Sequence, residues 1–343
     1  MQNIKTAFVT GSTGLLGNNL VKELLNRGYK VKVLTRSQKK AELQFHNLPI
    51  EIITGDLKQV ENFKEHLKNV DILFNTAAYF RDNYKGGNHW NELYETNIKG
   101  TQTLIESAIS SGIQNIVHTS SIAVLDGPEG SVINETMSRA LSNADNYYKS
   151  KILSENTVRE ISLKHPEVKF TYVLPGWMFG PGDLGPTSSG QLIQDYLQKK
   201  IPGIPPGTFS VVDARDVAIA HIQAAEVGIN GERYLAAGVE TNMHTLFELL
   251  EKTTHIKSPK IKLPYSLVYF IALLNETYSF LTKKPILMSL ESVRLLKKEK
   301  GKTNFNNEKS QTQLNLIFRS FEQTLLDTIP EIQARLINKE TKA

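Results

Sequence analysis

The chain has 343 residues, 40% of them hydrophobic, and a formal net charge of +5 at pH 7. This size and apolar content suffice for one large domain or two interleaved ones. The absence of cysteine excludes disulfides, thiolate metal sites and thiol nucleophiles, and it agrees with a reducing cytoplasm. The lysines are scattered without a nucleic-acid-binding signature, so we expect a solvated surface, no nucleic-acid partner and no metal site.

Two stretches bear on targeting. Residues 1–10 hold too short an apolar run for a signal peptide and lead into a glycine-rich turn, so a mature start and a cytoplasmic protein are expected. The most apolar later stretch, 265–281, is interrupted by Asn275 and Glu276 and is shorter than the roughly 20 residues that span a bilayer. It predicts a buried helix and no integral membrane segment, with membrane-surface contact as the weaker alternative.

Short apolar runs alternate with amphipathic stretches along the first half of the chain. Strands are expected at 6–11, 29–35, 50–54, 71–77, 115–121 and 170–175, and helices at about 15–27, 59–68, 90–111 and 147–163. This alternation predicts an α/β fold, a Rossmann-type doubly wound parallel sheet covered on both faces. The later order is less regular, with helices near 189–200, 213–226 and 244–253. We therefore expect a dinucleotide-binding domain over 1–175 and a mostly substrate-binding lobe over 176–343, some of whose segments return to the sheet.

The turn after the first expected strand points to a cofactor. The sequence TGSTGLLG places Gly11, Gly14 and Gly17 in a G-x-x-G-x-x-G pattern before an apolar-periodic helix. Glycines let the backbone approach a pyrophosphate at a helix N-terminus, where free N–H groups and the helix dipole favour negative charge. With a strand before it and a helix after it, the motif predicts a dinucleotide site. Its residues are Gly11, Ser12, Thr13, Gly14, Leu15 and Leu16.

The end of the second expected strand indicates which dinucleotide binds. An acidic residue there would accept hydrogen bonds from the ribose of NAD, but this chain has Arg36, followed by Lys39 and Lys40. A guanidinium pairs well with a 2′-phosphate, so NADP(H) is favoured and NAD(H) remains the alternative. After the third strand, Asp56 with its neighbour Leu57 is predicted to meet the adenine, unless Asp56 only caps a turn.

The hexapeptide NYYKSK at 146–151 suggests proton transfer. On a helix, Tyr147 and Tyr148 lie four and three residues before Lys151, so either ring can neighbour the ammonium. A nearby positive charge lowers the pKa of a phenol, as a tyrosine that donates and recovers a proton requires. Spacing alone leaves the two tyrosines equivalent, and an exposed helix face is the simpler interpretation of the hexapeptide by itself.

The chain resembles the extended short-chain dehydrogenase/reductases over nearly its whole length. The glycine pattern, DILFNTAA, YETNIKGT at 94–101, IVHTSS, YYKSK and LPGWMFGPGD at 174–183 follow that family's order and approximate intervals. The resemblance implies that Tyr147 is the proton donor or acceptor, and that Lys151 is its partner and also a ligand of the nicotinamide ribose. Ser121 would hold the substrate oxygen, with Ser120 as a one-residue alternative. Asn97 is expected to have a supporting structural role.

Further site residues follow from the same resemblance. Pro175 and Gly176 would approach the nicotinamide carboxamide, and Ala77 would lie beside the cofactor. The substrate pocket would be lined by apolar side chains, for which core packing is the alternative. These are Tyr79, Phe80, Trp177, Met178 and Phe179.

One element narrows the branch of the family. The sequence VVDARDVAIAHI at 211–222, with Asp213, Arg215 and Asp216, resembles the dihydroflavonol-reductase and cinnamoyl-CoA-reductase branch, although a helix cap and an ion pair explain each charge separately. Nucleotide-sugar enzymes often carry an arginine at the position of Phe209. Extended members often carry histidine at the position of Asn75. Asparagine could still hydrogen-bond backbone groups there, so we expect a local change without loss of activity.

The sequence thus predicts an NADP(H)-dependent reductase that converts a ketone or aldehyde to an alcohol. A sugar epimerase or dehydratase that keeps its NAD(P) is the second hypothesis, and a non-catalytic dinucleotide sensor is the third. A hydroxysteroid or another lipid-like substrate would suit the apolar pocket residues. The resemblance also suggests a homodimer through helices 90–111 and 147–163, although an exposed helix pair in a monomer would give the same pattern.

Overall fold

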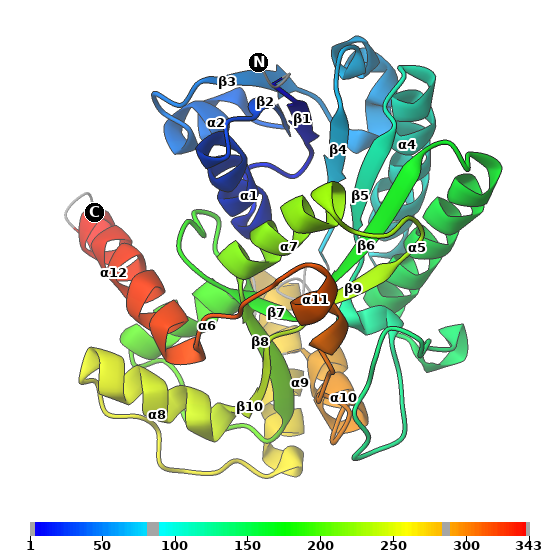
Figure 1. The fold of residues 1–343 in the computed structure, drawn as a ribbon. Helices are drawn as coiled ribbons and strands as arrows, with labels where there is room; N and C mark the ends of the chain where they lie inside the picture. The colour runs from blue at the N-terminus through cyan, green and yellow to red at the C-terminus, as the bar shows by residue number, and fades with distance from the viewer. Residues whose placement is uncertain (1–3, 81–88, 283–288, 341–343) are drawn as a thin grey trace.

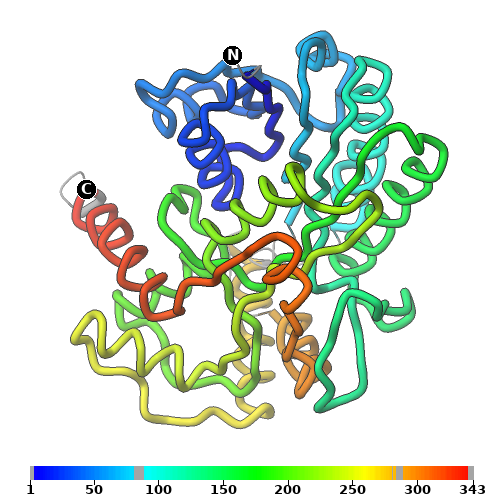
Figure 2. The backbone as a smooth tube through the Cα atoms, in the orientation of Figure 1, coloured from blue at the N-terminus to red at the C-terminus, as the bar shows by residue number. Residues whose placement is uncertain are grey.

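The computed structural model describes residues 4–80, 89–282 and 289–340, and its centre is a seven-stranded parallel sheet (Figure 1). The strand order is β3-β2-β1-β4-β5-β6-β9. The strands are β1 (Thr6–Val9), β2 (Lys30–Thr35), β3 (Ile50–Thr54), β4 (Ile72–Asn75), β5 (Asn115–Thr119), β6 (Lys169–Pro175) and β9 (Arg233–Ala236). The predicted Rossmann-type sheet is confirmed, and β9 joins it from the second half of the chain (Figure 2).

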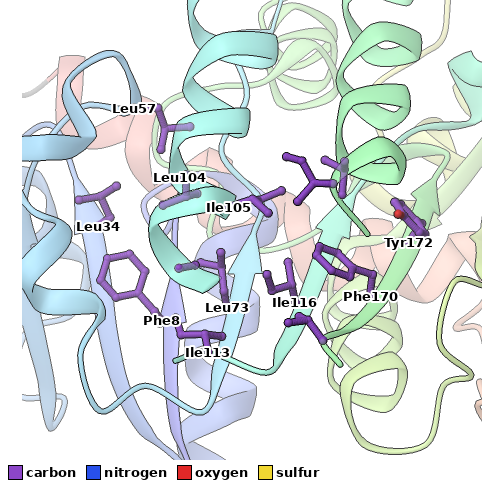
Figure 3. Close-up of a cluster of buried hydrophobic side chains, with 14 of the residues drawn as sticks. Phe8, Leu34, Leu57, Leu73, Leu104, Ile105, Ile113, Ile116, Phe170 and Tyr172 are labelled. Carbon is purple, nitrogen blue, oxygen red and sulfur yellow. The ribbon is translucent and has the colours of Figure 1, made fainter. Parts of the chain in front are cut away.

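Helices cover both faces because successive side chains of each strand point to opposite sides. On one face, Ala7 and Val9 of β1 pack with α1 (Leu15–Asn26), α2 (Gln38–Gln44) and α7 (Ala214–Glu226). On the other, Phe8 packs with α4 (Thr101–Ser110) and α5 (Asn146–Lys164), as Figure 3 shows for the core on that side. All six strands expected before residue 176 are present.

The helix expected at 59–68 is wrong in type. The structure has two short 3-10 segments there, η1 (Leu57–Asn62) and η2 (Lys64–Leu67). Gln59 has non-helical backbone angles. Four apolar side chains at spacings of three or four nevertheless reach the core, which is why the pattern looked helical. They are Leu57, Val60, Phe63 and Leu67.

The helix expected at 90–111 is divided into three parts. It begins as α3 (Trp90–Leu93), widens into the π-helical η3 (Tyr94–Gly100) and continues as α4. A Cβ at Gly100 would lie 2.9 Å from the carbonyl oxygen of Leu57, so only glycine permits this contact with η1. The π-helical turn contains Asn97, which bears on the site below.

The second half of the chain adds a small sheet that the sequence did not predict. Strands β10 (Val239–Asn242), β8 (Thr208–Asp213) and β7 (Trp177–Phe179) form it, with β8 antiparallel to β10 and parallel to β7. Around it lie helices that Figure 1 labels. They are α6 (Ser188–Leu197), α8 (Met243–Thr254), α9 (Tyr265–Thr282), α10 (Leu290–Lys298) and α12 (Phe321–Glu340). Helix α11 (Glu308–Gln313) instead packs on β9 of the large sheet, where Ser310 Oγ donates to the carbonyl of Leu235. Within the ranges described, no helix is both long and apolar enough to cross a bilayer.

Candidate active site

The glycine-rich turn has the close backbone contacts that a dinucleotide loop needs. Gly11 has a positive φ of +61°, and a Cβ on it would lie 2.8 Å from the Cα of Ala77. A Cβ on Gly17 would lie 2.3 Å from the carbonyl oxygen of Gly11. A side chain at Gly11 would therefore push the turn away from the segment after β4, and a side chain at Gly17 would push α1 away from the turn. The turn brings the expected cofactor residue Ala77 against Gly11.

The N-terminus of α1 suits a negatively charged group. Its N-cap is Gly14, which supplies no side-chain cap for the first N–H groups. Ser12 is turned away and donates to the carbonyl of Leu34 at 2.9 Å, which ties the loop to β2. Arg36 is exposed just beyond β2. These features fit a nicotinamide dinucleotide with its pyrophosphate at α1.

Asp56 and Leu57, the two residues expected beside the adenine, have structural roles. Asp56 is the N-cap of η1 and accepts from the backbone N–H of Lys58 at 2.9 Å, which is the capping alternative. Leu57 is buried. Lys40 is half-buried. Its burial lowers the pKa of its ammonium, and the negative charge of Asp183 offsets part of this by raising the pKa.

Below the cofactor loop, a buried polar chain joins the ends of β1, β4 and β5. The hydroxyl of Thr10 donates to Asn75 Oδ1 at 3.0 Å and accepts from the N–H of Ala77, also at 3.0 Å. Asn75 Nδ2 lies 3.2 Å from His118 Nδ1. The side chain of Asn75 thus bonds the side chains of Thr10 and His118 rather than backbone groups. Burial lowers the pKa of His118 well below its usual value, so this ring is neutral.

Helix α5 presents the tyrosines and the lysine. Asp145 caps it by accepting from the N–H of Tyr148 at 2.7 Å, so NYYKSK forms the first turns. Lys151 is only 4% exposed, and its Nζ donates to the carbonyl oxygen of Thr119 at 2.7 Å. Burial lowers the pKa of Lys151 to about 8, against a smaller raising effect of Glu155. The ammonium is therefore held in a fixed place at the carboxyl end of β5.

The two tyrosines have different neighbours. The ring of Tyr147 meets Phe80 edge to face, with centroids 4.9 Å apart. The guanidinium of Arg139 lies 4.9 Å from the ring centroid of Tyr148, and the same guanidinium pairs with Glu299 at 2.9 Å. Tyr148 is thus engaged by a structural cation, whereas Tyr147 lies beside an expected substrate residue.

The two serines after β5 also differ. Ser120 is buried and donates its hydroxyl to Glu155 Oε2. Ser121 is partly exposed and accepts from the N–H of Ala123 at 3.1 Å, which leaves its own proton to be donated elsewhere. This geometry supports Ser121 over Ser120 as the residue that holds a substrate oxygen.

Asn97 fixes the segment that carries Tyr79. Its Oδ1 accepts from the N–H of Tyr79 at 2.6 Å, and its Nδ2 donates to the carbonyl of Tyr79 at 2.9 Å. The same Nδ2 lies 3.1 Å from Ser150 Oγ, next to Lys151 in the chain. The π-helical turn thereby links the loop after β4 to α5.

Glu155, a residue that the sequence did not single out, lies beneath this site. It is one helical turn beyond Lys151 and 1% exposed. Its Oε1 accepts from Arg233 Nε of β9 at 2.6 Å and from Arg159 Nε at 3.1 Å, while Oε2 accepts from Ser120. One carboxylate thus joins α5, β5 and β9.

The residues after β6 that were expected to line the substrate pocket differ in how far they are exposed. Phe179 is 1% exposed and packs against Trp177 and Phe321, at centroid distances of 4.8 and 5.0 Å, which agrees with the core-packing alternative. Met178 is half-buried and packs against the core of the large sheet. Trp177 remains half-exposed, and its Nε1 donates to Ser188 at 2.9 Å.

Pro175 and Gly176 end β6 beside β9. Pro175 is paired with Ala236, and a Cβ on Gly176 would lie 2.7 Å from the carbonyl oxygen of Ala237. The crowding leaves room only for glycine at this strand end, where we expect the nicotinamide.

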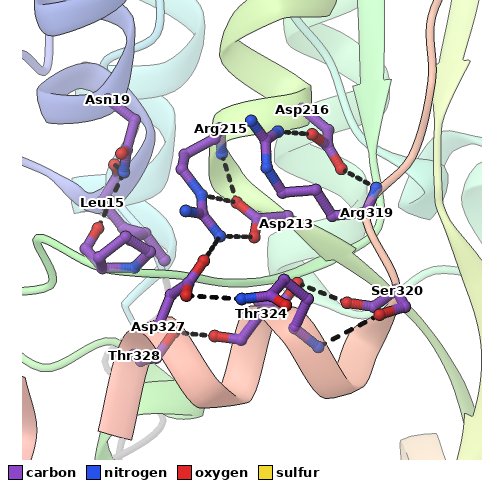
Figure 4. A network of polar contacts seen from close by, with 12 residues as sticks. Leu15, Asn19, Asp213, Arg215, Asp216, Arg319, Ser320, Thr324, Asp327 and Thr328 are labelled. Atoms are coloured by element: carbon purple, nitrogen blue, oxygen red, sulfur yellow. Dashed lines mark hydrogen bonds and ion pairs between the residues drawn. The ribbon is translucent and has the colours of Figure 1, made fainter. Parts of the chain in front are cut away.

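The charges of the VVDARDVA element are structural (Figure 4). Asp213 caps α7 and pairs with Arg215, which also contacts Asp327 of α12 at 2.7 Å. Asp216 is buried against Arg319, whose backbone N–H donates to it at 2.7 Å. These pairs attach the C-terminal helix to the β8–α7 turn, in agreement with the cap and ion-pair alternative.

His221 of α7 supports the end of β5 from the opposite side. Its Nδ1 lies 2.7 Å from the carbonyl of Val217, which can only accept, so Nδ1 carries the proton. Its Nε2 therefore accepts from the hydroxyl of Thr119, also at 2.7 Å. Burial lowers the pKa of His221 to about 4. Thr119 is thus held by His221 through its side chain and by Lys151 through its carbonyl.

The comparisons with known proteins agree with this geometry. Residues 7–237 match the model of the NAD dependent epimerase/dehydratase family. The chain belongs to that family and is an NAD(P)-dependent oxidoreductase of the extended short-chain dehydrogenase/reductase type. The sequence prediction of the family is thereby confirmed.

Individual relatives are similar over most of their length. Sterol demethylase protein B of Methylococcus capsulatus is 31% identical over 96% of this chain and 99% of its own. A Synechocystis protein carrying the name dihydroflavonol 4-reductase is 27% identical over 94% and 93%. The sterol-4-alpha-carboxylate 3-dehydrogenase of Mus musculus is 28% identical over 79% and 74%.

Solved structures share the fold. The crystal structure of gox2253 is 27% identical and superposes with a TM-score of 0.81, covering 97% of this chain and 99% of that one. Yeast Gre2 complexed with NADPH superposes with a TM-score of 0.74 at 21% identity, covering 96% of this chain and 99% of that one. MoeE5 in complex with UDP-glucose and NAD gives 0.72, also at 21%, over 97% and 99%. Both dinucleotides occur among these neighbours.

We expect the histidine behind the site to make folding sensitive to acid. In the unfolded chain His221 regains its usual pKa of 6.5, against about 4 when folded. The unfolded state therefore binds more protons between these values, and His221 stabilises the fold less as the pH falls from 6.5 to about 4. His221→Phe should cost about 1–3 kcal/mol at neutral pH, because the Thr119 hydroxyl loses its acceptor, but should lose less stability on acidification than the parent.

Urea unfolding at several pH values measures both effects, with His46→Asn, at an exposed position, as the matched control. Parallel pH curves for His221→Phe and the parent would contradict this account of His221.

Proposed function

We propose that the protein is an NADP(H)-dependent reductase that converts a ketone or aldehyde to an alcohol, with Tyr147 as the proton donor. The observation that carries the proposal is the place of Tyr147 one helical turn before Lys151, whose Nζ is fixed at 2.7 Å from the Thr119 carbonyl. A phenol and a held ammonium on one helix face are the groups that a carbonyl reduction needs.

Each residue has a separate task. Lys151, while protonated, lowers the pKa of the Tyr147 phenol and stabilises the phenolate that remains after proton donation. Ser121 donates a hydrogen bond to the substrate oxygen as negative charge develops on it. The dinucleotide, held at Gly11–Gly17 and by Arg36 on its 2′-phosphate, supplies the hydride. The same groups serve the reverse oxidation.

The carbonyl substrate is proposed to be apolar, such as a steroid ketone or another lipid-like ketone, with the corresponding hydroxysteroid or lipid-like alcohol as the product. Phe80 is 46% exposed beside Tyr147, and half-exposed Trp177 lies at the start of β7. Two relatives have names that refer to sterols, which supports the same class.

A nucleotide sugar fits the site less well. Phe209 occupies the position where related sugar enzymes often carry arginine, and it is 9% exposed with its ring 4.9 Å from Trp177. An aromatic pair offers no charge to a diphosphate, whose burial without cations is costly. The epimerase hypothesis is therefore the second choice.

Removing one phenol should abolish the reaction. Tyr147→Phe is expected to lower kcat for carbonyl reduction by about 10²–10⁴, because the proton donor is lost, while NADPH still binds. The assay follows NADPH oxidation with a panel of aldehydes, ketones, steroid ketones and nucleotide sugars. Tyr148→Phe is the matched control and should stay near the parent rate. Near-normal turnover by Tyr147→Phe would refute the assignment.

Cofactor choice should depend on Arg36. Arg36→Ala is expected to weaken NADPH binding by roughly tenfold to a hundredfold, the value of one charge-assisted hydrogen bond, and to leave NADH binding unchanged. Titration calorimetry with each cofactor measures the ratio, and the neighbouring Lys39→Ala serves as the control. An equal loss for both cofactors would argue against a 2′-phosphate contact.

A further inference from the structure

The expectation of a buried helix at 265–281 is wrong, because α9 has a broad apolar face turned to solvent. Its inner side, with Val268 and Ala272, packs on Val293 of α10 in a small core cluster. Seven large apolar residues on the other side are between 41% and 74% exposed. They are Leu267, Tyr269, Phe270, Leu273, Leu274, Tyr278 and Leu281, and we call them the α9 face.

The arrangement of the α9 face is that of an amphipathic helix whose apolar side is unpartnered in the described chain. At 100° per residue, these seven positions fall within one half of the helical circumference, opposite Val268, Ala272 and Ser279. No charged residue projects from this half among the described residues of α9. Glu276 lies at its edge and accepts from the backbone N–H of Leu290 at 2.9 Å. Exposed apolar patches of this kind mark interaction sites.

The chain around α9 is strongly basic. Residues 257–302 contain ten lysines and arginines against three acidic residues, a net charge of +7 where the whole chain has +5. Before α9, Lys257, Lys260 and Lys262 are exposed. Helix α10 packs beside α9, and Figure 1 shows the two helices next to β8 and β10. Arg294 and Lys297 of α10 are exposed.

We propose that the α9 face binds the surface of an anionic phospholipid bilayer, with α9 lying in the plane of the interface. The apolar side chains enter the boundary between headgroups and acyl chains, and the flanking basic residues meet the anionic headgroups. A twofold dimer through the same face is the less favourable occupant, because it would bring the same basic flanks of two copies together. The proposal does not depend on the chemistry at Tyr147.

The test is co-sedimentation of the full chain with vesicles of phosphatidylcholine alone or mixed with phosphatidylglycerol. The parent should bind the mixed vesicles, and added salt should weaken the binding. Phe270→Glu combined with Leu274→Glu should reduce it about tenfold or more, because two carboxylates would enter the apolar layer. Leu281→Glu, at the most exposed position, is a milder second variant that should also weaken binding.

The matched control places the same charges on leucines elsewhere. Leu43 and Leu163 are 72% and 82% exposed outside the α9 face, and their combined change to glutamate should leave vesicle binding unchanged. Thermal unfolding checks that all variants are folded. The proposal is overturned if the parent does not bind the mixed vesicles or binds neutral vesicles equally well. It is also overturned if the control change at Leu43 and Leu163 weakens binding as much as the change at Phe270 and Leu274. If the parent does not bind vesicles but forms a dimer, and Phe270→Glu combined with Leu274→Glu makes it monomeric, the α9 face is a contact between two copies of the chain.

Discussion

The buried carboxylate of Glu155 is the interaction on which the candidate site depends. It receives Arg233 from β9, Arg159 from its own helix and the hydroxyl of Ser120 after β5. A carboxylate that is 1% exposed is stable only when its hydrogen bonds are satisfied, so these three elements are held in one relative position. Lys151 lies one turn before it on α5, and Ser121 follows Ser120. Glu155 thus fixes the positions of the candidate catalytic residues without contacting Tyr147 or Ser121.

The end of β5 is fixed in the same way from two directions. Lys151 bonds the Thr119 carbonyl and His221 bonds the Thr119 hydroxyl. His118 and His221 are buried and neutral, so they add no positive charge that would compete with Lys151. At the end of β5 the ammonium of Lys151 is therefore flanked by neutral histidines, which suits a tyrosine that cycles between phenol and phenolate near neutral pH.

Much of this could be predicted from local sequence. The glycine spacing at residues 11–17 indicates a turn whose close contacts leave no room for a side chain at Gly11 or Gly17, and Tyr147 and Lys151 are four residues apart on one helix. Ion pairs between distant parts of the sequence could not be predicted. Arg233 is 78 residues from Glu155, and the residues around each of them give no sign that the two are partners. The short strands of the second sheet lacked a clear alternating pattern, and the apolar spacing at 57–67 fits a 3-10 path as well as an α-helix. The burial of Phe179 in the core could not be predicted either, because a phenylalanine is equally common in a substrate pocket and in a core.

The most direct test of the central claim is the fate of the hydride. NADPH carrying deuterium at the reactive C4 position is incubated with the protein and an apolar ketone, and the product is analysed by mass spectrometry. The account predicts an alcohol with the deuterium on the carbinol carbon, formed in step with the NADPH consumed. An isomerised product without deuterium, formed while the labelled cofactor stays intact, would contradict it and identify a transient use of the dinucleotide.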